Sequence, residues 1–164
     1  MCAARLGPGR LSMLREAHAA DLEGVRALFR EYAEWLGVDL CFQSFEEEIA
    51  TLPGKYAPPK GRLLIAEVEG RLAGVVGLRP LAEDVCEMKR LYVPQWAKGR
   101  GIGRELVERV VAEARTADYR AMRLDTLPTT MLQANHLYDR LGFREIPPYY
   151  ENPVPNVRYL ELLL

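Results

Sequence analysis

The sequence has few residues of the kinds that build metal centres or disulfide frameworks. Its 164 residues include three cysteines, Cys2, Cys41 and Cys86, and two histidines, His18 and His136. No two cysteines lie close enough in sequence for a zinc-binding or redox pair, and an odd number does not indicate a disulfide framework. We therefore expect no metal, and we expect a reducing compartment, the cytoplasm.

Long apolar runs and an excess of charge of one sign are also missing. No stretch approaches the roughly 18 apolar residues that a membrane-spanning helix requires. The 22 lysines and arginines nearly balance 23 aspartates and glutamates, which gives a formal net charge of −1. A chain so close to neutral has no general attraction to nucleic acid or to an anionic membrane. We expect neither of them as a partner.

The chain is expected to form one domain over residues 11–164. Apolar residues make up 49% of the sequence and charged residues 27%, which is ordinary for a globular protein. A chain of this size buries well over half of its unfolded surface, and no repeat or low-complexity tract divides it. Residues 1–10 contain Gly7, Pro8 and Gly9 and no apolar run, so we interpret them as a disordered or vector-derived start rather than a signal peptide.

Apolar periodicity and turn residues predict seven strands and four helices. Ser44 with Glu47 and Thr130 with Gln133 have capping-box spacing. The helices are expected from Asp21 as N-cap to Gly37, from Ser44 to Pro53, from about Gly101 to Arg115, and from Thr130 to Gly142. The strands are expected at Leu11–Ala17, Arg62–Glu69, Leu72–Pro80, Val85–Val93, Arg120–Thr126, Phe143–Ile146 and Val157–Leu164. This order predicts an α/β (α+β) fold with helices packed on one mixed sheet.

The most informative segment is the glycine-rich turn between the strand that ends at Val93 and the following helix. Gly99, Gly101 and Gly103 stand at alternate positions and remove the Cβ atoms that would keep a ligand from the backbone. The N–H groups of the first helical turn then point at one place, where the helix dipole favours negative charge. We interpret the turn as an anion site suited to a diphosphate; the alternative is a flexible surface turn.

A dinucleotide site of the Rossmann type is the competing interpretation of this turn. It also combines a strand, a glycine-rich turn and a helix with an acidic residue about 20 positions later, and Asp125 stands near that place. However, the third glycine comes one residue early, and Arg104 stands where close packing of helix on strand requires Gly or Ala. A P-loop is excluded because no Gly-Lys-Ser/Thr follows the turn.

Two motifs together resemble the GNAT superfamily of acetyl-CoA-dependent N-acetyltransferases, over roughly residues 11–164. The family signature after a strand, Gln/Arg-x-x-Gly-x-Gly/Ala, reads here Lys98-Gly99-Arg100-Gly101-Ile102-Gly103. A later helix that ends in a Leu-Tyr…Gly-Phe pattern is present as residues 137–143. Two positions depart from the pattern. Lys98 replaces the usual Gln or Arg, and Met131 stands about where many members carry an asparagine that contacts the cofactor.

The resemblance implies a fold and a cosubstrate. The sheet would be mostly antiparallel, with about seven strands flanked by about four helices, and the strands ending at Val93 and near Asp125 would splay apart. The arm of acetyl-CoA would lie in that gap and pair with exposed strand backbone. The residues expected to bind acetyl-CoA are Leu91, Tyr92, Val93, Lys98, Gly99, Arg100, Gly101, Ile102, Gly103 and Arg104.

Three residues are candidates for proton transfer, because acetylation requires a neutral amine and a protonated leaving thiol. Glu87 matches the place where some family members carry a glutamate base, and strand alternation puts it on the same face as Leu91 and Val93. The alternative is a strand carboxylate that is exposed or forms a salt bridge. Asp125 is the second candidate base, or else a strand-end residue that binds backbone. Tyr138 is the candidate acid, since family members place this tyrosine by the thioester; otherwise it is a buried helix tyrosine.

The acceptor pocket is expected between the first two helices and the late loop. Glu46, Glu47 and Glu48 either form a solvated helix face or attract a cationic amine, and Tyr149, Tyr150 and Asn152 either wall the pocket or cover a sheet edge. Because no histidine and acid are patterned around Cys86, we expect direct attack in a ternary complex rather than a covalent cysteine intermediate. The predicted acceptor is a primary amine of a small molecule, amino acid or protein. The alternative function is a non-catalytic acyl-CoA-binding regulatory module, and a homodimer is left open.

Overall fold

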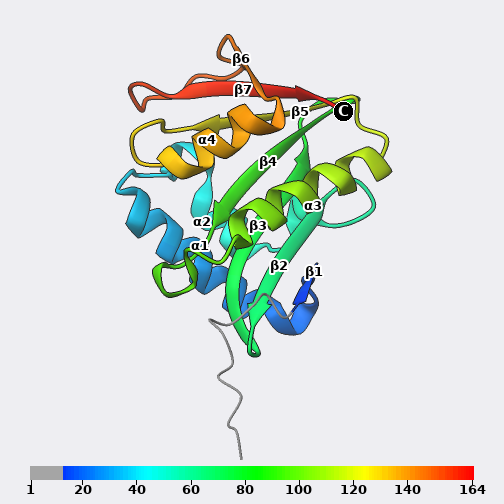
Figure 1. Cartoon of the computed structure of the whole chain (residues 1–164), viewed down its shortest axis with the longest axis vertical. Helices are drawn as coiled ribbons and strands as arrows, with labels where there is room; N and C mark the ends of the chain where they lie inside the picture. The colour runs from blue at the N-terminus through cyan, green and yellow to red at the C-terminus, as the bar shows by residue number, and fades with distance from the viewer. Residues whose placement is uncertain (1–12) are drawn as a thin grey trace, which may run out of the picture.

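Figure 1 shows the computed structural model of the chain, which describes residues 13–164. One sheet of seven strands crosses the molecule in the order β1-β2-β3-β4-β5-β7-β6. Neighbouring strands are antiparallel except β4 and β5, which are parallel. The predicted single, mixed and mostly antiparallel sheet is therefore confirmed. Residues 1–10 and the first two residues of the expected first strand lie outside the described residues.

The order of elements along the chain is the one that periodicity predicted, with ends that differ by a residue or two. The strands are β1 (Met13–Glu16), β2 (Arg62–Val68), β3 (Arg71–Pro80), β4 (Val85–Tyr92), β5 (Ala121–Thr126), β6 (Arg144–Ile146) and β7 (Arg158–Leu163). The α-helices are α1 (Leu22–Leu36), α2 (Phe45–Ala50), α3 (Ile102–Thr116) and α4 (Leu132–Leu141). Short 3-10 helices are η1 (Ala19–Asp21), η2 (Cys41–Gln43), η3 (Gly54–Tyr56) and η4 (Gln95–Ala97).

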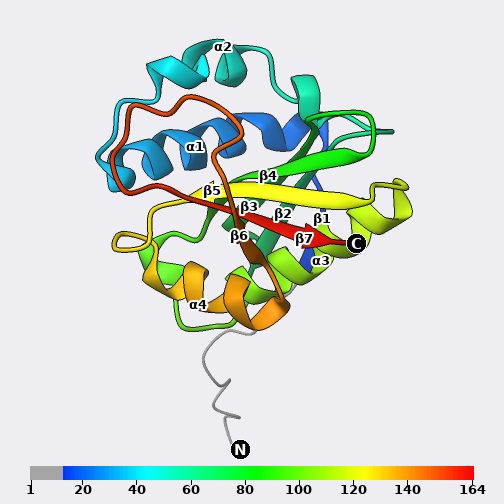
Figure 2. The same cartoon turned by 90° about the horizontal axis from the view of Figure 1, so that it is seen from above.

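The helices form one layer on each face of the sheet. Seen from above in Figure 2, α1 and α2 lie on one face, and α3 and α4 lie on the other. The segment between β6 and β7 bends over the face of α1 and α2 before the chain returns as β7. Each face buries its own apolar core, because a strand sends alternate side chains to opposite faces.

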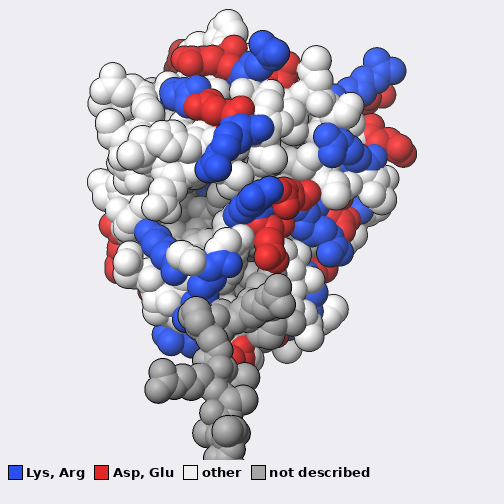
Figure 3. Space-filling model, viewed as in Figure 1, with Lys and Arg blue, Asp and Glu red and all other residues white. Residues whose placement is uncertain are grey.

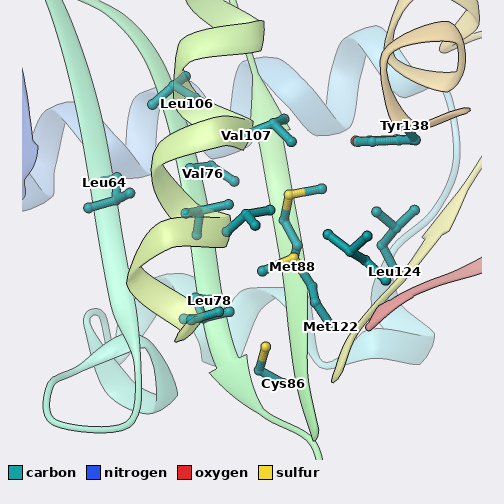
Figure 4. Packing of buried hydrophobic residues seen from close by; sticks show 14 of the residues in the cluster. Leu64, Val76, Leu78, Cys86, Met88, Leu106, Val107, Met122, Leu124 and Tyr138 are labelled. Atoms are coloured by element: carbon teal, nitrogen blue, oxygen red, sulfur yellow. The ribbon is translucent and has the colours of Figure 1, made fainter. Parts of the chain in front are cut away.

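The larger core lies under α3. Leu106 and Val107 of this helix pack against Leu64, Val76 and Met88 of the strands (Figure 4). All five side chains are at most 3% exposed, and the helical spacing of the α3 stripe predicted this buried face. Burial of a leucine of this kind stabilises the fold by about 2 kcal/mol, so α3 is held firmly against the sheet.

The predicted helix caps are only partly confirmed. Ser44 stands at the N-cap of α2, but its side chain forms no capping hydrogen bond and its φ is 55°. Helix α4 begins after Met131 rather than after Thr130. Asp21 stands at the N-cap of α1 as predicted, yet its carboxylate is 2.7 Å from Arg15 instead. The same carboxylate also accepts the His18 N–H at 2.7 Å, so its oxygens are engaged outside the first turn of α1.

Strand β4 contains a bulge at Arg90 that changes which face its last residues occupy. The φ of Arg90 is 62°, and the register with β3 shifts at this point. Glu87 points to the face of α1 and α2, where it bonds to the segment between β6 and β7, whereas Leu91 and Val93 pack on the α3 core. The expectation that these three side chains share one face is therefore wrong. One extra residue reverses the alternation of a strand.

Candidate active site

Strands β4 and β5 part after a short parallel contact. They pair only between Val85–Glu87 and Ala121–Arg123. Beyond this contact, β4 stays paired with β3 as far as Tyr92, and β5 stays paired with β7 as far as Thr126. The facing backbone edges of the two strands therefore lack a partner in the sheet along their last residues. The expected splayed strand pair is present.

Two hollows adjoin this parting. The first, which we call the strand hollow, lies between the ends of β4 and β5 and is lined by Leu91, Asp125, Met131 and Tyr138 among others. The second, which we call the α2 hollow, lies beside α2 and the middle of β4 and is lined by Glu48, Tyr56, Arg79, Glu87, Tyr149 and Tyr150 among others. Gln43 and Lys89 line both hollows, so the hollows meet at these two side chains.

Tyr138 presents a protonated phenol to the strand hollow. Its side chain is 2% exposed, and its ring packs on Phe143 with 5.5 Å between centroids. Burial raises the pKa of Tyr138, and the nearby charge of Asp125 raises it further, because both disfavour the phenolate. Tyr138 therefore remains a proton donor at neutral pH, as the predicted acid must.

Asp125 is held at the edge of the same hollow by side chains. Its Oδ2 accepts a hydrogen bond from the Tyr150 hydroxyl at 2.6 Å and a longer one from Asn152 Nδ2 at 3.4 Å. Its Oδ1 lies 3.5 Å from Lys89 Nζ. The alternative expectation, that Asp125 binds backbone at the end of its strand, does not describe these contacts. Tyr150 and Asn152 therefore contact a candidate site residue, which agrees with the expectation that they wall the pocket rather than only cover a sheet edge.

Glu87 lies apart from this pair, in the α2 hollow. It is 1% exposed, and both of its carboxylate oxygens are occupied. Oε1 is 2.9 Å from Arg79 Nε, and Oε2 accepts a hydrogen bond from the Tyr149 hydroxyl at 2.6 Å. Glu87 is therefore a strand carboxylate that forms a salt bridge, as the alternative interpretation of this residue expected. The structure brings Asp125 and Tyr138 together and places Glu87 in the adjoining hollow.

A buried charged cluster joins the two hollows, and the sequence analysis missed its importance. Arg90 is 4% exposed and holds Glu48 through two contacts of 2.9 and 3.2 Å. Lys89, also buried, donates to Gln43 Oε1 at 3.2 Å. Burial lowers the pKa of Lys89, partly offset by Asp125 and Glu87. The signal in the sequence was the presence of two adjacent cations and Glu87 in a strand whose other residues are apolar, because such charges are buried only when paired. Of the three candidate glutamates on α2, Glu48 is partly buried and bound to Arg90. Glu46 and Glu47 are exposed, although Glu47 also lines the α2 hollow.

The glycine-rich turn has the geometry of an anion site. Gly99 and Gly101 adopt φ values of 80° and 78°, which glycine adopts without strain. The first hydrogen bond of α3 runs from the Glu105 N–H to the Gly101 carbonyl. The N–H groups of residues 102–104 precede that bond and therefore have no intrahelical acceptor. Donors at a helix N-terminus suit the diphosphate of a coenzyme.

Cationic side chains flank this part of the surface. Lys98 lies over the ring of Trp35 with its Nζ 4.9 Å from the centroid, and Arg104 pairs with Glu108 on the exposed surface of α3 at 2.8 Å. Figure 3 shows a hollow on this face, between α4 and the N-terminal end of α3, with Lys and Arg side chains around it. An anion placed there meets positive charge on several sides.

Residues 22–143 match the family described as the acetyltransferase (GNAT) family. The chain belongs to this family. Two curated relatives are similar over most of their length. An uncharacterized N-acetyltransferase of Schizosaccharomyces pombe is 39% identical over 157 residues, covering 94% of this chain and 96% of the relative. An uncharacterized N-acetyltransferase of Dictyostelium discoideum is 34% identical over 205 residues, covering 87% and 94%. This GNAT chain is an N-acetyltransferase.

Solved GNAT structures share the fold. An acetyltransferase from Streptococcus agalactiae has a TM-score of 0.73 at 21% identity, covering 93% of this chain and 98% of that one. A Salmonella typhimurium structure containing acetyl-CoA has a TM-score of 0.68 at 19% identity, covering 92% of each chain. A Vibrio cholerae spermidine N-acetyltransferase in complex with CoA and spermine has a TM-score of 0.69 at 20% identity, covering 92% and 94%. The predicted GNAT-like architecture is confirmed.

The asparagine that the GNAT pattern expects near Met131 has no counterpart there, but Asn135 anchors the same region. Met131 lines the strand hollow. Asn135 is 3% exposed, donates to Thr126 Oγ1 at 3.0 Å and accepts from Arg158 at 2.9 Å. It thus ties the end of β5 to α4 and β7. The sequence did not single out Asn135, because the spacing of residues along a helix does not distinguish a buried asparagine from an exposed one.

The remaining reactive residues of this GNAT chain lie outside the two hollows. Cys86 is buried, and burial raises the pKa of its thiol to about 12, which suppresses the nucleophilic thiolate. His136 is exposed on α4. Within residues 13–164 no group of three or more His, Cys, Asp or Glu side chains is arranged to hold a metal ion. No helix in the same range has the length and apolarity needed to cross a bilayer.

Proposed function

We propose that this chain transfers the acetyl group of acetyl-CoA to a primary amine by direct attack within a ternary complex. The observation that carries the proposal is the strand hollow, where a buried phenol and a carboxylate line the gap between two unpaired strand edges. Amine acetylation requires a base for the amine and an acid for the leaving thiolate within one site. The solved relatives with CoA or acetyl-CoA bound support the choice of cosubstrate.

The glycine-rich turn and the end of β4 would bind the cosubstrate. The N–H groups that begin α3 would bind the diphosphate, and the free backbone edge of residues 91–93 would pair with the amide groups of the pantetheine arm. Acetyl-CoA supplies the acetyl group as a thioester. A backbone N–H at or beside Val93 would donate to the carbonyl oxygen as it gains charge.

Asp125 and Tyr138 would move the protons. Asp125 accepts a proton from the ammonium form of the acceptor, so that the neutral amine can attack the carbonyl carbon and form the new C–N bond. As the C–S bond breaks, Tyr138 donates its proton to the departing sulfur. The second proton released by nitrogen restores Tyr138 or passes to water. The products are an N-acetylated amine, CoA with a free thiol, and one proton.

The test is release of free CoA thiol from acetyl-CoA across a panel of primary amines. The proposal expects saturable release with at least one amine and none with the enzyme and acetyl-CoA alone. Saturable CoA binding without release on any acceptor would instead support the non-catalytic acyl-CoA-binding module. A thermal shift with NAD or NADP exceeding that with acetyl-CoA would restore the dinucleotide interpretation. The homodimer and the cytoplasmic location stay predictions.

A further inference from the structure

Arg79, Lys89 and Arg90 of the buried cluster form four ion pairs that differ in how closely they are formed. Arg79 binds Glu87 at 2.8 Å, and Arg90 binds Glu48 at 2.9 Å. The other two contacts are longer: Arg79 Nη1 lies 3.8 Å from Glu48 Oε1, and Lys89 Nζ lies 3.5 Å from Asp125 Oδ1. Charge-assisted hydrogen bonds are normally about 2.7 to 2.9 Å long. Arg79 and Glu48 each have a close partner as well, whereas Lys89 and Asp125 form no closer ion pair among the described residues. We therefore call Lys89–Asp125 the loose pair.

Both members of the loose pair have unused hydrogen-bonding capacity. A lysine ammonium has three donors, and Lys89 directs one toward Gln43 and one weakly toward Asp125. Tyr150 and Asn152 bond to Oδ2 of Asp125, which leaves Oδ1 with the long contact to Lys89. A buried ammonium group and a partly buried carboxylate thus lie side by side in the strand hollow, next to the junction of the two hollows at Lys89.

We propose that the acceptor is a free α-amino acid, whose carboxylate binds Lys89 while its amino group lies against Oδ1 of Asp125. This inference rests on the proposed function and names its substrate class. In an α-amino acid the two charged groups are attached to one carbon, so they are as close together as the charges of the loose pair. When the carboxylate of the zwitterion lies beside Lys89 and its ammonium group lies beside Asp125, each of the four charged groups is next to a group of opposite charge.

This arrangement suits the reaction as well as binding. The ammonium group of the amino acid would contact Asp125, the residue proposed to remove its proton. The other cations of the cluster are already engaged by Glu48 and Glu87, so Lys89 is the cation left for a ligand carboxylate. The side chain of the acceptor would extend into the α2 hollow, which Lys89 also lines. A polyamine, by contrast, would bring a second positive charge toward Lys89.

The experiment compares matched acceptors. The twenty amino acids are screened first by CoA thiol release; for the best of them, kcat/KM is measured for the acid, its α-carboxamide and the amine lacking the carboxyl group. We expect the acid to exceed both analogues by at least about tenfold. The carboxamide is the weaker base and more of it is neutral at pH 7.5, so a preference for the acid cannot come from amine reactivity. Equal or faster turnover of the carboxamide or of spermidine would overturn the proposal.

Lys89→Met is the decisive variant, because it keeps length and apolar volume and removes the charge. In Lys89→Met we expect the ratio of kcat/KM for the acid to kcat/KM for the carboxamide to fall to about three or less, mainly because KM for the acid rises. Lys89→Arg keeps the positive charge and should retain part of the preference. Lys55→Met is the matched control, since Lys55 lines the α2 hollow from an exposed position. It should keep the wild-type preference. A preference unchanged in Lys89→Met would refute the assignment.

Binding separates failure of this inference from failure of the proposed function. Calorimetric titration of each acceptor into enzyme saturated with CoA measures recognition without chemistry. One outcome is that no amine supports thiol release, that the acid still binds at least tenfold more tightly than its amide, and that Lys89→Met removes this difference. This result would support the amino-acid site and contradict the transfer reaction. If turnover occurs without that selectivity, the reaction stands and the inference falls. Loss of CoA binding in a variant identifies misfolding, and Lys89→Gln then replaces it.

Discussion

Asp125 and Tyr138 line one hollow, yet their surroundings suit them to opposite tasks. Tyr138 is surrounded by apolar side chains of the α3 core, so burial raises its pKa and keeps the proton on the phenol. Asp125 instead receives hydrogen bonds from Tyr150 and Asn152, which are the contacts that a carboxylate requires. Two titratable groups whose environments differ in this way form an acid and a base within a single site.

Replacement of Tyr138 by phenylalanine tests the acid. We expect kcat to fall by about 10 to 100-fold, while the affinity for acetyl-CoA changes less than threefold, because the ring remains. Since the pKa of Tyr138 lies well above 10, its ionisation should not reduce the wild-type rate below pH 10. Tyr119→Phe is the control, as that buried hydroxyl binds a backbone carbonyl away from the site. Equal kcat for Tyr138→Phe and wild type at all pH values would remove the role.

A pair of carboxylate variants separates the two candidate bases. Asp125→Asn should lower kcat by about 100-fold or more and leave acetyl-CoA binding intact. Glu87→Gln should lower kcat much less, but should destabilise the fold by about 2 kcal/mol, because it removes a charged partner from Arg79. Pre-steady-state acetylation and urea denaturation measure the two effects. The opposite ranking of the two variants in kcat would return the catalytic role to Glu87.

The N-terminal end of α3 is the element on which cosubstrate binding depends. Its first-turn N–H groups have no intrahelical acceptor, and the preceding glycines at positive φ shape the backbone beside them. The same helix is anchored in the core, where Leu106 lies against the strands. Packing of α3 therefore decides where its N–H donors point.

Gly101→Glu should abolish acetyl-CoA binding without unfolding the chain. A carboxylate there would repel the diphosphate, and a residue with a Cβ at a φ of 78° costs about 1 to 2 kcal/mol. Nothing lies within 4 Å of an added Cβ at this position, so the side chain itself fits. Gly101→Ala is the control for backbone strain and should retain most of the binding. Calorimetric affinity for acetyl-CoA equal to wild type in Gly101→Glu would refute the placement of the diphosphate.

The contact of α3 with β3 is tested at Gly74. A Cβ there would come within 2.8 Å of Leu106 Cδ1, so Gly74→Ala should lower the free energy of unfolding by about 2 kcal/mol. Leu106→Ala should lower it by about 3 kcal/mol through the cavity it creates. The double variant should lose about 1 kcal/mol less than the sum, because the shortened side chain makes room. Strict additivity in urea denaturation would contradict this packing.

Across the whole molecule, buried phenols should decide the alkaline limit of stability. Burial raises the pKa of both Tyr56 and Tyr138 above the ordinary value of 10, and each is 2% exposed. A group whose folded pKa is raised keeps its full contribution below its unfolded pKa. That contribution is lost as pH rises toward the folded value, because only the unfolded chain then releases the proton.

The free energy of unfolding should therefore fall above about pH 10, with each of these tyrosines adding about 1.4 kcal/mol per pH unit to the slope. Urea denaturation between pH 8.5 and 11.5 measures it. In the Tyr56→Phe and Tyr138→Phe double variant, the free energy of unfolding should decline less steeply with pH than in wild type. The comparison uses the slope with pH, because the substitutions also change packing and so shift the value at neutral pH. The same slope in both proteins would show that other groups govern the alkaline limit.

Local pattern was sufficient for much of this molecule. The order of strands and helices, the stop signals at Gly37 and Gly142, and the glycine-rich turn before α3 follow from periodicity and glycine conformation, which act over a few neighbouring residues. The two GNAT motifs then led to the mostly antiparallel sheet with its splayed strand pair and to Tyr138 as a candidate. These are properties of short segments, so the sequence by itself determined them.

Tertiary structure decided which side chains meet. The bulge at Arg90 reversed the face on which Glu87 was expected, and no local signal marks that extra residue because it depends on the partner strand. Tyr150, distant in sequence, approaches Asp125 only because the segment between β6 and β7 bends over α1 and α2. Lys89 acquires its partners from two other elements, Gln43 of η2 and Asp125 of β5, and desolvation makes such partners obligatory for a buried charge. The phosphate turn is a local property of the sequence, whereas the chemistry beside it is a product of the fold.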